Sequence, residues 1–300
     1  MKKVFKWIGI VLGALIGLLL VAGVVLYFVG SSRVNKVYEI PDSGIVAPTD
    51  AQSIERGKHI VESSCVGCHG ADLGGIEAFI NIDGIASADS ANLTSGEGGL
   101  GGIYSDEDFV RAIRHGVSQD GTGNFMPPVP SFQYMSDEDL GAVIAYMRTV
   151  SPVDHQTSAF QAQPLGYILF AVGMFGDLPA EVVTHQNNIN TVEPGITVEY
   201  GEYRLRVSAC QDCHGMDLAG GAFPDPSVTV LVPNLTPGGE LAAWTEEQFI
   251  TTIRTGVTPS GHEINKELMP LEEINQLTDD ELKAIFTYLK TLPALPQNTE

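Results

Sequence analysis

The pattern Cys-x-x-Cys-His occurs twice in this chain and uses all four of its cysteines. It is typical of c-type haem attachment, in which two thiols add to the vinyl groups of one haem and the histidine binds the iron. Zinc would need a second cysteine pair within reach, and a thioredoxin-like dithiol would need a βαβ setting that the helical, glycine-rich surroundings do not offer. The sequence therefore predicts two covalently attached haem c groups. The attachment residues are Cys65, Cys68 and His69 in the first copy and Cys210, Cys213 and His214 in the second.

The first thirty residues indicate a membrane anchor. A run of 23 residues without a charge extends from Ile8 to Gly30, and about 20 helical residues cross a bilayer. Three lysines precede the run, so the positive-inside rule places the N-terminus in the cytoplasm and the rest of the chain on the periplasmic side. A cleaved signal peptide is the alternative, but its apolar region is usually about 7–15 residues long. We expect a single-pass, uncleaved anchor in the bacterial cytoplasmic membrane.

The exported part of the chain is strongly acidic. The chain has 37 acidic and 16 basic side chains, and residues 1–30 hold three of the basic ones and none of the acidic ones. The remainder therefore carries 37 acidic against 13 basic side chains, a net charge of −24. Such a charge disfavours nucleic acid and anionic lipid as partners and would steer basic patches on a partner protein. It equally serves to keep a periplasmic protein soluble, and composition does not choose between the two.

The chain contains an internal duplication. Several landmarks recur in the same order at an offset of 140 to 145 residues: the haem motif, Gly-x-Asp-Leu-x-Gly, Asn-Leu-Thr, Arg-x-Gly-Val, Met-Pro and an acidic helix start. The sequence therefore predicts two similar units. We expect an anchor at 1–30, a linker at 31–48, the first unit at 49–150, an interdomain segment at 151–197, the second unit at 198–292 and a tail at 293–300.

Each unit shows the same pattern of helix signals. The first helix is expected to run from the N-cap candidate Asp50 to the haem cysteines, with a counterpart over residues 200–209. The middle helix is expected after Ser105 or Thr245, and the last helix after Ser136 or Thr278, at capping-box spacing in the second unit. Alternating strand patterns are scarce, so the sequence predicts an all-α fold in which a haem fills the core of each unit.

These motifs resemble class I cytochrome c domains, in which a helix ends in Cys-x-x-Cys-His and a Met-Pro loop precedes the closing helix. The exported part as a whole is similar to tandem cytochrome c proteins related to the cytochrome c subunits of membrane-bound alcohol dehydrogenases, particularly in its Asn-Leu-Thr and Arg-x-Gly segments. The resemblance covers about residues 50–150 and 198–292. It implies electron transfer with redox partner proteins, but no substrate, because the dehydrogenase chemistry of that group belongs to a different subunit.

A class I domain takes its second axial ligand from the loop before the last helix. Met126 and Met269 occupy that place, and each is followed by a proline that stiffens the loop. Thioether ligation opposite the motif histidine would raise the haem potential and leave no open iron position. Met135 is the rival in the first unit, but its counterpart in the second unit is Leu277. We therefore expect His69/Met126 and His214/Met269 as the iron ligands.

Other matched features leave alternatives open. Arg114 and Arg254 are equivalent, and each could bond a haem propionate or form a helix-surface salt bridge. His115 and His262 have no equivalents, and either could replace a methionine in one unit. The sequons at 92–94 and 234–236 are interpreted as structural turns, because they recur within duplicated haem domains.

Two further features concern packing. Gly57 lies eight residues before Cys65, while Gly201 lies nine before Cys210, so one first helix is shifted or bulged if these glycines mark a helix crossing. The apolar segment 164–175 is too short to span a membrane. It lies either on the membrane surface or between the haem domains, and the absence of basic flanking residues favours packing between the domains.

The leading functional prediction is a membrane-tethered carrier of single electrons between a dehydrogenase or quinol-oxidising complex and a terminal acceptor such as an oxidase. A dihaem oxidoreductase of the peroxidase or thiosulfate-oxidising type is the second reading, but it needs an open iron position that the Met-Pro loops disfavour. An accessory haem subunit of a respiratory complex is the third. No catalytic residue is predicted, and nucleic acid is not an expected partner.

Overall fold

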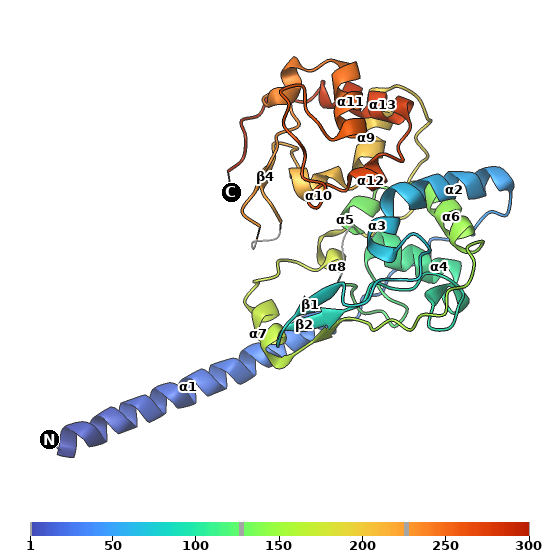
Figure 1. Cartoon of the computed structure of the whole chain (residues 1–300). Coiled ribbons are helices and arrows are strands. Elements are labelled where there is room, and N and C mark those ends of the chain that lie inside the picture. Colours follow the sequence, from blue (N-terminus) through green and yellow to red (C-terminus); the bar gives the residue numbers. More distant parts are fainter. Residues whose placement is uncertain (1, 126–128, 225–227, 300) are drawn as a thin grey trace.

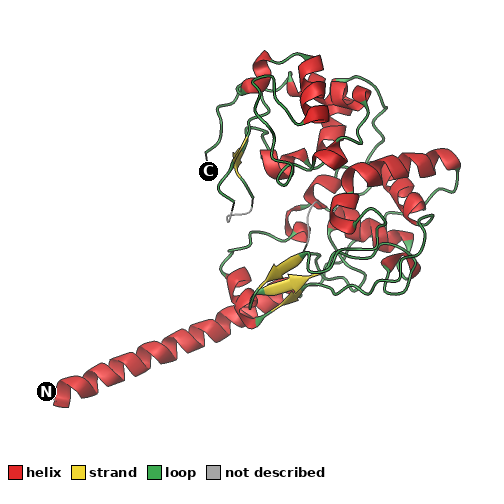
Figure 2. Ribbon diagram, viewed as in Figure 1, coloured by secondary structure: helices red, strands yellow, loops and turns green. Residues whose placement is uncertain are grey.

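The computed structural model describes residues 2–125, 129–224 and 228–299. It has two mostly helical units side by side and one long helix, α1, that projects from the first unit (Figure 1). Figure 2 shows how little strand there is: two small antiparallel sheets of short strands. The all-α fold class is confirmed, and the small sheets are additions that the sequence patterns did not indicate.

The elements follow the duplication. The anchor and first unit contain α1 (Lys2–Val34), α2 (Ala51–Ser64), α3 (Val66–His69), β1 (Ile80–Ile82), β2 (Ala86–Ala88), η1 (Leu100–Gly102), α4 (Asp106–Val110), the π-helical turn η2 (Arg111–His115), α5 (Val129–Phe132) and α6 (Asp137–Met147). The interdomain segment contains β3 (Gln161–Ala162), α7 (Pro164–Ala171) and α8 (Pro179–Val182). The second unit contains α9 (Val198–Val207), α10 (Cys210–His214), β4 (Gly221–Ala222), β5 (Leu231–Val232), η3 (Glu240–Ala243), α11 (Glu246–Thr255), α12 (Leu271–Ile274) and α13 (Asp279–Leu289).

The first and last helices of each unit cross in close contact, α2 with α6 and α9 with α13. A Cβ atom added at Gly57 would lie 1.9 Å from the carbonyl oxygen of Ala142, and one added at Gly201 would lie 1.9 Å from that of Ala284. Both glycines therefore lie at a helix crossing, which is the condition under which the first helices of the two units are offset by one residue. The extra residue of the second unit lies beyond the crossing: α9 ends at Val207, and Ala209 turns the chain with a φ of 56° before the motif begins.

The residue at which each of these helices begins is set by an N-cap side chain directly before it. Asp50 accepts a hydrogen bond from the backbone of Ser53 at the start of α2, as predicted. The first helix of the second unit begins at Val198 and not at residue 200, because Thr197 caps it. A full capping box also forms in the first unit at Ser105, where Asp in place of Glu reaches back to the backbone.

The Asn-Leu-Thr segments are buried structural turns, as interpreted from the sequence. Asn92 and Thr94 are completely buried, and Asn92 Oδ1 accepts hydrogen bonds from both the backbone and the hydroxyl of Thr94. Asn92 Nδ2 also donates to the carbonyl oxygen of Val153 at 2.7 Å, and Asn234 Nδ2 donates to that of Leu295 at 2.8 Å. In each unit this asparagine fastens the chain that follows the last helix onto the loop that follows the haem motif.

The apolar segment 164–175 does not lie between the two haem units, so the preference for packing there is wrong. It forms α7, which packs against the C-terminal end of α1 and beside β3 at the base of the first unit (Figure 1). Phe170 is buried in a small cluster with Val34 of α1 and Leu178. The absence of basic flanking residues was a poor guide because the anchor helix itself supplies the partner surface.

The helix crossings give the first testable prediction. Replacing Gly57 or Gly201 by alanine should lower the midpoint of thermal unfolding, because overpacking against a backbone carbonyl costs about 1–3 kcal/mol or more and exceeds the helix-propensity gain of about 1 kcal/mol. Circular dichroism of the full chain in detergent measures it. Gly102→Ala is the control, since its nearest new neighbour would lie at 3.5 Å. Unchanged midpoints for both crossing variants would contradict the crossing.

Candidate functional site

Each Cys-x-x-Cys-His segment forms a short helix directly after the first helix of its unit. The motif histidines are oriented in the same way: His69 Nδ1 lies 2.7 Å from the carbonyl oxygen of Ala91, and His214 Nδ1 lies 2.9 Å from that of Pro233. A carbonyl can only accept, so Nδ1 carries the proton in both rings. Nε2 then has its lone pair free, which is the state of a histidine that binds a metal through Nε2.

Burial sets the protonation of the motif side chains. It lowers the pKa of His69 and His214 below the ordinary value of 6.5, so both rings are neutral at pH 7 and able to ligate. Burial raises the pKa of the Cys65 and Cys210 thiols to about 12. These thiols therefore stay protonated at pH 7. Zinc binding and redox-dithiol chemistry both need a thiolate, so the environment suits sulfurs that are held in thioether bonds instead.

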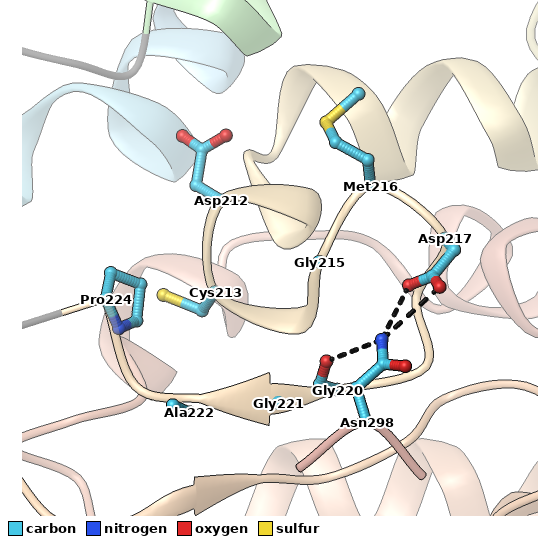
Figure 3. Close-up of a pocket in the computed structure, with 10 residues that line it drawn as sticks. All are labelled: Asp212, Cys213, Gly215, Met216, Asp217, Gly220, Gly221, Ala222, Pro224 and Asn298. Carbon is cyan, nitrogen blue, oxygen red and sulfur yellow. Dashed lines mark hydrogen bonds between the residues drawn. The ribbon is translucent and has the colours of Figure 1, made fainter. Parts of the chain in front are cut away.

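The surroundings of the motifs fit a haem. A hollow opens beside the sulfur of Cys213, and three of the residues that line it are glycines, Gly215, Gly220 and Gly221 (Figure 3). In the first unit, Arg114 is fully buried, and its Nε and Nη1 have no hydrogen-bond partner among the described residues. Donors of this kind suit a propionate. Zinc is not favoured by the rest of the structure, because no group of three or more His, Cys, Asp or Glu side chains gathers as a metal site in residues 2–125, 129–224 and 228–299.

The structure describes one of the two predicted axial methionines, Met269, and not the other, Met126. Met269 packs against the same apolar cluster of the second unit as Cys210. Met126 lies outside the described residues. Met135, its rival, is 1 % exposed in the core of the first unit, and its counterpart Leu277 is buried in the second core, so this position packs in both units.

The other histidines are engaged elsewhere. His115 is completely buried, with Nε2 3.1 Å from Asn187 Oδ1 and its Nδ1 3.4 Å from that of His185. Burial lowers the pKa of His115 to about 4, so its ring is neutral at pH 7. It lies where the interdomain segment packs against the first unit. His262 is exposed on a loop. Neither arrangement is that of a haem ligand.

The matched arginines fasten the middle helix to the last helix of each unit. Arg114 Nη2 bonds the carbonyl oxygen of Met135 and lies 2.7 Å from Asp137. Arg254 Nη2 likewise bonds that of Leu277 and lies 2.7 Å from Asp279. Both arginines therefore form a salt bridge with an aspartate of the last helix. In the buried Arg114, Nε and Nη1 still have no hydrogen-bond partner among the described residues.

The two haem motifs face the boundary between the units. The third residue of the second motif, Asp212, accepts a hydrogen bond of 2.7 Å from the hydroxyl of Ser131 in α5. The third residue of the first motif, Gly67, lies against Glu273 in α12, where an added Cβ would be 2.8 Å from Oε1. Ser131 and Glu273 occupy equivalent places, each in the short helix before the last one. Each motif therefore touches the same element of the other unit, an arrangement related by an approximate twofold axis.

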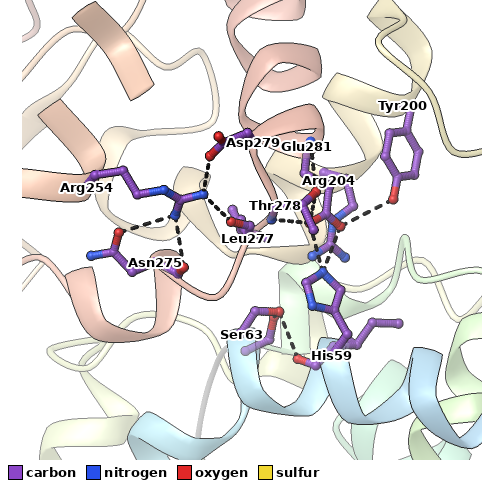
Figure 4. A network of polar contacts seen from close by, with 12 residues as sticks. His59, Ser63, Tyr200, Arg204, Arg254, Asn275, Leu277, Thr278, Asp279 and Glu281 are labelled. Atoms are coloured by element: carbon purple, nitrogen blue, oxygen red, sulfur yellow. Dashed lines mark hydrogen bonds and ion pairs between the residues drawn. The ribbon is translucent and has the colours of Figure 1, made fainter. Parts of the chain in front are cut away.

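A second pair of reciprocal contacts crosses the same boundary. His59 of α2 places Nε2 2.8 Å from Glu281 at the start of α13 (Figure 4). At the equivalent position of α9, Tyr203 donates its hydroxyl hydrogen to Asp139 at the start of α6. Burial alone would raise the pKa of Glu281, but the hydrogen bond from His59 and the positive charge of Arg204 lower it to about 2.

Two family models match the chain in the places where the geometry repeats. The model described as "Cytochrome c" matches residues 54–151, and the model described as "Cytochrome C oxidase, cbb3-type, subunit III" matches residues 199–289. The chain carries two cytochrome c domains. Two such domains hold two covalently bound haem c groups, so the predicted cofactor is confirmed.

Relatives with known roles resemble this cytochrome over most of its length. The cytochrome c subunit of a quinone alcohol dehydrogenase from Gluconobacter oxydans is 29 % identical over 83 % of this chain and 56 % of its own length. The fructose dehydrogenase cytochrome subunit of Gluconobacter japonicus is 26 % identical over 85 % and 55 %. A protein named "Diheme cytochrome c-type" from Cereibacter sphaeroides is 25 % identical over 80 % and 86 %. The cytochrome thus spans little more than half of the two dehydrogenase subunits.

Sequence reasoning missed the residues that join the two domains. His59 and Tyr203 follow the crossing glycines by two positions in both units. Ser131 and Glu273 each lie five positions before the residue that caps the last helix of their unit, Ser136 or Thr278. Aligning the duplicated units was the signal that could have shown these positions to be equivalent. It could not have shown that they face the opposite unit, because the side chains differ in each pair.

The attachment residues give a prediction of haem content. Cys65→Ala combined with Cys68→Ala should lower the pyridine-haemochrome signal of the purified cytochrome by about half, because one haem then has no thiol to bond its vinyl groups, and Cys210→Ala combined with Cys213→Ala should do the same in the second unit. Met216→Ala, at an exposed side chain close to the second motif, is the control and should keep the full signal. A zinc-loaded, haem-free protein from cells with cytochrome c maturation would contradict the assignment.

The Glu281 contact predicts how stability depends on pH. Its folded pKa of about 2 lies below the ordinary 4.5, so the charged carboxylate stabilises the folded state above about pH 4.5, and this contribution is lost as the pH falls toward 2. A shift of this size corresponds to about 3 kcal/mol at most. Glu281→Gln keeps the helix cap but should lower the unfolding midpoint at pH 7 and flatten its fall in acid.

Thermal unfolding of the full chain in detergent between pH 2 and 7 measures this effect. Glu272→Gln, at an exposed glutamate of α12, should behave as the unchanged protein does. An acid profile of Glu281→Gln that matches that of the unchanged protein would show that the carboxylate is not the group responsible.

Proposed function

We propose that this chain is a membrane-tethered dihaem electron carrier that receives single electrons from a dehydrogenase or a quinol-oxidising complex and delivers them to a terminal acceptor. The observation that carries the proposal is the reciprocal contact of the two haem motifs across the domain boundary. The hydrogen bond from Ser131 to Asp212 and the contact of Gly67 with Glu273 bring both motifs to one junction. Such an arrangement suits electron exchange between the two domains.

The proposed iron ligands are His69 and Met126 in the first domain and His214 and Met269 in the second. A bound haem c supplies one-electron exchange at its iron. The carbonyl oxygens of Ala91 and Pro233 hold the two imidazoles in the ligating tautomer. Histidine and methionine together would hold the iron and leave it no position for oxygen or peroxide, which would favour outer-sphere electron transfer.

The proposed location is the periplasmic side of the cytoplasmic membrane, with α1 as an uncleaved single-pass anchor. α1 is long and apolar enough to cross a bilayer, although a signal sequence passes the same test. The contact between its C-terminal turns and α7 supports retention, because cleavage near residue 30 would remove part of a packed interface. The lysines before the apolar run support a cytoplasmic N-terminus.

The proposed partner is a membrane-bound dehydrogenase. The relatives named as cytochrome subunits of alcohol and fructose dehydrogenases support this class of partner, and the net charge of −24 on the exported part favours partners with a basic docking face. A dihaem oxidoreductase of the peroxidase or thiosulfate-oxidising type remains the alternative, as does an accessory subunit of a respiratory complex.

The axial ligands decide between carrier and enzyme. The far-red sulfur-to-iron band of the oxidised protein should fall by about half in Met126→Ala and disappear when Met269→Ala is added, while carbon monoxide should leave the spectrum of the reduced, unchanged protein as it is. Met135→Ala is the control and should keep the band. A band that falls by half in Met135→Ala and stays whole in Met126→Ala would refute the ligand assignment, and binding of carbon monoxide by the unchanged protein would favour the enzyme.

A further inference from the structure

Helix α7 lies along the C-terminal end of the anchor helix. A Cβ added at Gly30 would lie 1.7 Å from the carbonyl oxygen of Tyr167, so the two backbones touch at this point. The ring of Tyr167 also meets that of Tyr27 edge to face, with centroids 5.4 Å apart. Figure 1 shows α7 beside the point where α1 enters the first domain.

The length of the apolar run sets the depth of this contact. The 23 residues from Ile8 to Gly30 span about 34 Å as a helix, against a hydrocarbon core of about 30 Å. Gly30 therefore lies at the boundary between acyl chains and headgroups, and so does Tyr167, which touches it. Tyrosine rings at this depth are typical of membrane interfaces.

The outer surface of this segment is apolar and open. Residues 164–176 contain no charged side chain. Four apolar side chains, here called the collar, are exposed there: Leu165 at 50 %, Val172 at 56 %, Met174 at 67 % and Phe175 at 37 %. An apolar surface of this kind that adjoins a membrane helix is expected to be covered.

Arg33 holds the collar against the anchor. Its guanidinium donates to the carbonyl oxygens of Phe170 and Gly176 at 3.1 and 2.9 Å, and it pairs with Asp177 at 2.9 Å and Glu181 at 2.6 Å. These contacts close the turn that follows α7 around the last residues of α1. The collar is therefore fixed in height relative to the bilayer.

We propose that the collar is inserted in the lipid at the boundary between headgroups and acyl chains, as a second membrane contact that orients the first cytochrome c domain on the bilayer. The inference rests on the proposed anchor, whose membrane-embedded surface is continuous with the collar. The acidic surface of the exported part disfavours attraction to anionic lipid. The contact is therefore hydrophobic, and a zwitterionic membrane suffices for it.

Spin labelling tests this depth directly. Leu165→Cys and Met174→Cys, each in the full haem-loaded chain, are labelled with a nitroxide and reconstituted into phosphatidylcholine vesicles. The ratio of collision rates with oxygen and with a water-soluble nickel chelate is then measured. Ile103→Cys is the matched control, since Ile103 is 65 % exposed and lies three residues before α4, a helix that Figure 1 shows well away from α1. Any label taken up by the unchanged protein is subtracted.

We expect the ratio of oxygen to nickel collisions at both collar positions to exceed the ratio at Ile103→Cys several-fold, and to be unaffected by salt. The inference would be overturned if nickel accessibility at both collar positions equalled that of the control. The collar would then be exposed to water in the vesicle-bound protein, either as a free surface or as a surface for a protein partner. Flotation of the unchanged protein with the vesicles distinguishes the proposed anchor from the proposed insertion of the collar. Failure to float would refute the anchor, whereas flotation with nickel-accessible labels would refute only the insertion of the collar.

Discussion

The close crossing of the first and last helices at Gly57 and Gly201 is the contact on which the rest of each domain depends. A side chain larger than hydrogen cannot fit there, because the opposing carbonyl oxygen would lie 1.9 Å from its Cβ. The first helix leads directly into the haem motif, so the crossing fixes where the cysteines and the histidine stand. Two residues further along the same helix, His59 and Tyr203 reach the other domain. One helix thus positions the cofactor and joins the domains.

At the junction between the domains, equivalent positions of the two domains make the contacts, but the side chains at those positions differ. His59 meets Glu281 across it, and Tyr203 meets Asp139 at the equivalent place. In both cases the acceptor is the carboxylate that belongs to the first turn of the last helix, where the free backbone N–H groups favour negative charge. A duplicated pair of domains packed about an approximate twofold axis brings equivalent surfaces together, so both haem motifs arrive at the same boundary. This geometry supports the proposed electron exchange between the domains.

The base of the molecule depends on a different kind of contact. The interdomain segment, which follows the first domain in sequence, returns to the anchor helix and packs against it through Gly30, Arg33 and Val34. The C-terminal end of α1 is therefore packed against the first domain, and the short apolar helix α7 supplies the surface that it contacts.

The sequence by itself determined the two haem motifs, the duplication, the all-α class and most of the helix caps, because each depends on residues close together in the chain or repeated at a fixed offset. The tertiary structure alone decided where α7 lies, what His59 and Tyr203 contact, and which carbonyls hold the motif histidines. Those contacts join residues from 19 to 222 positions apart. They depend on how two domains and an anchor pack in space, and local propensity and periodicity carry no information about that packing.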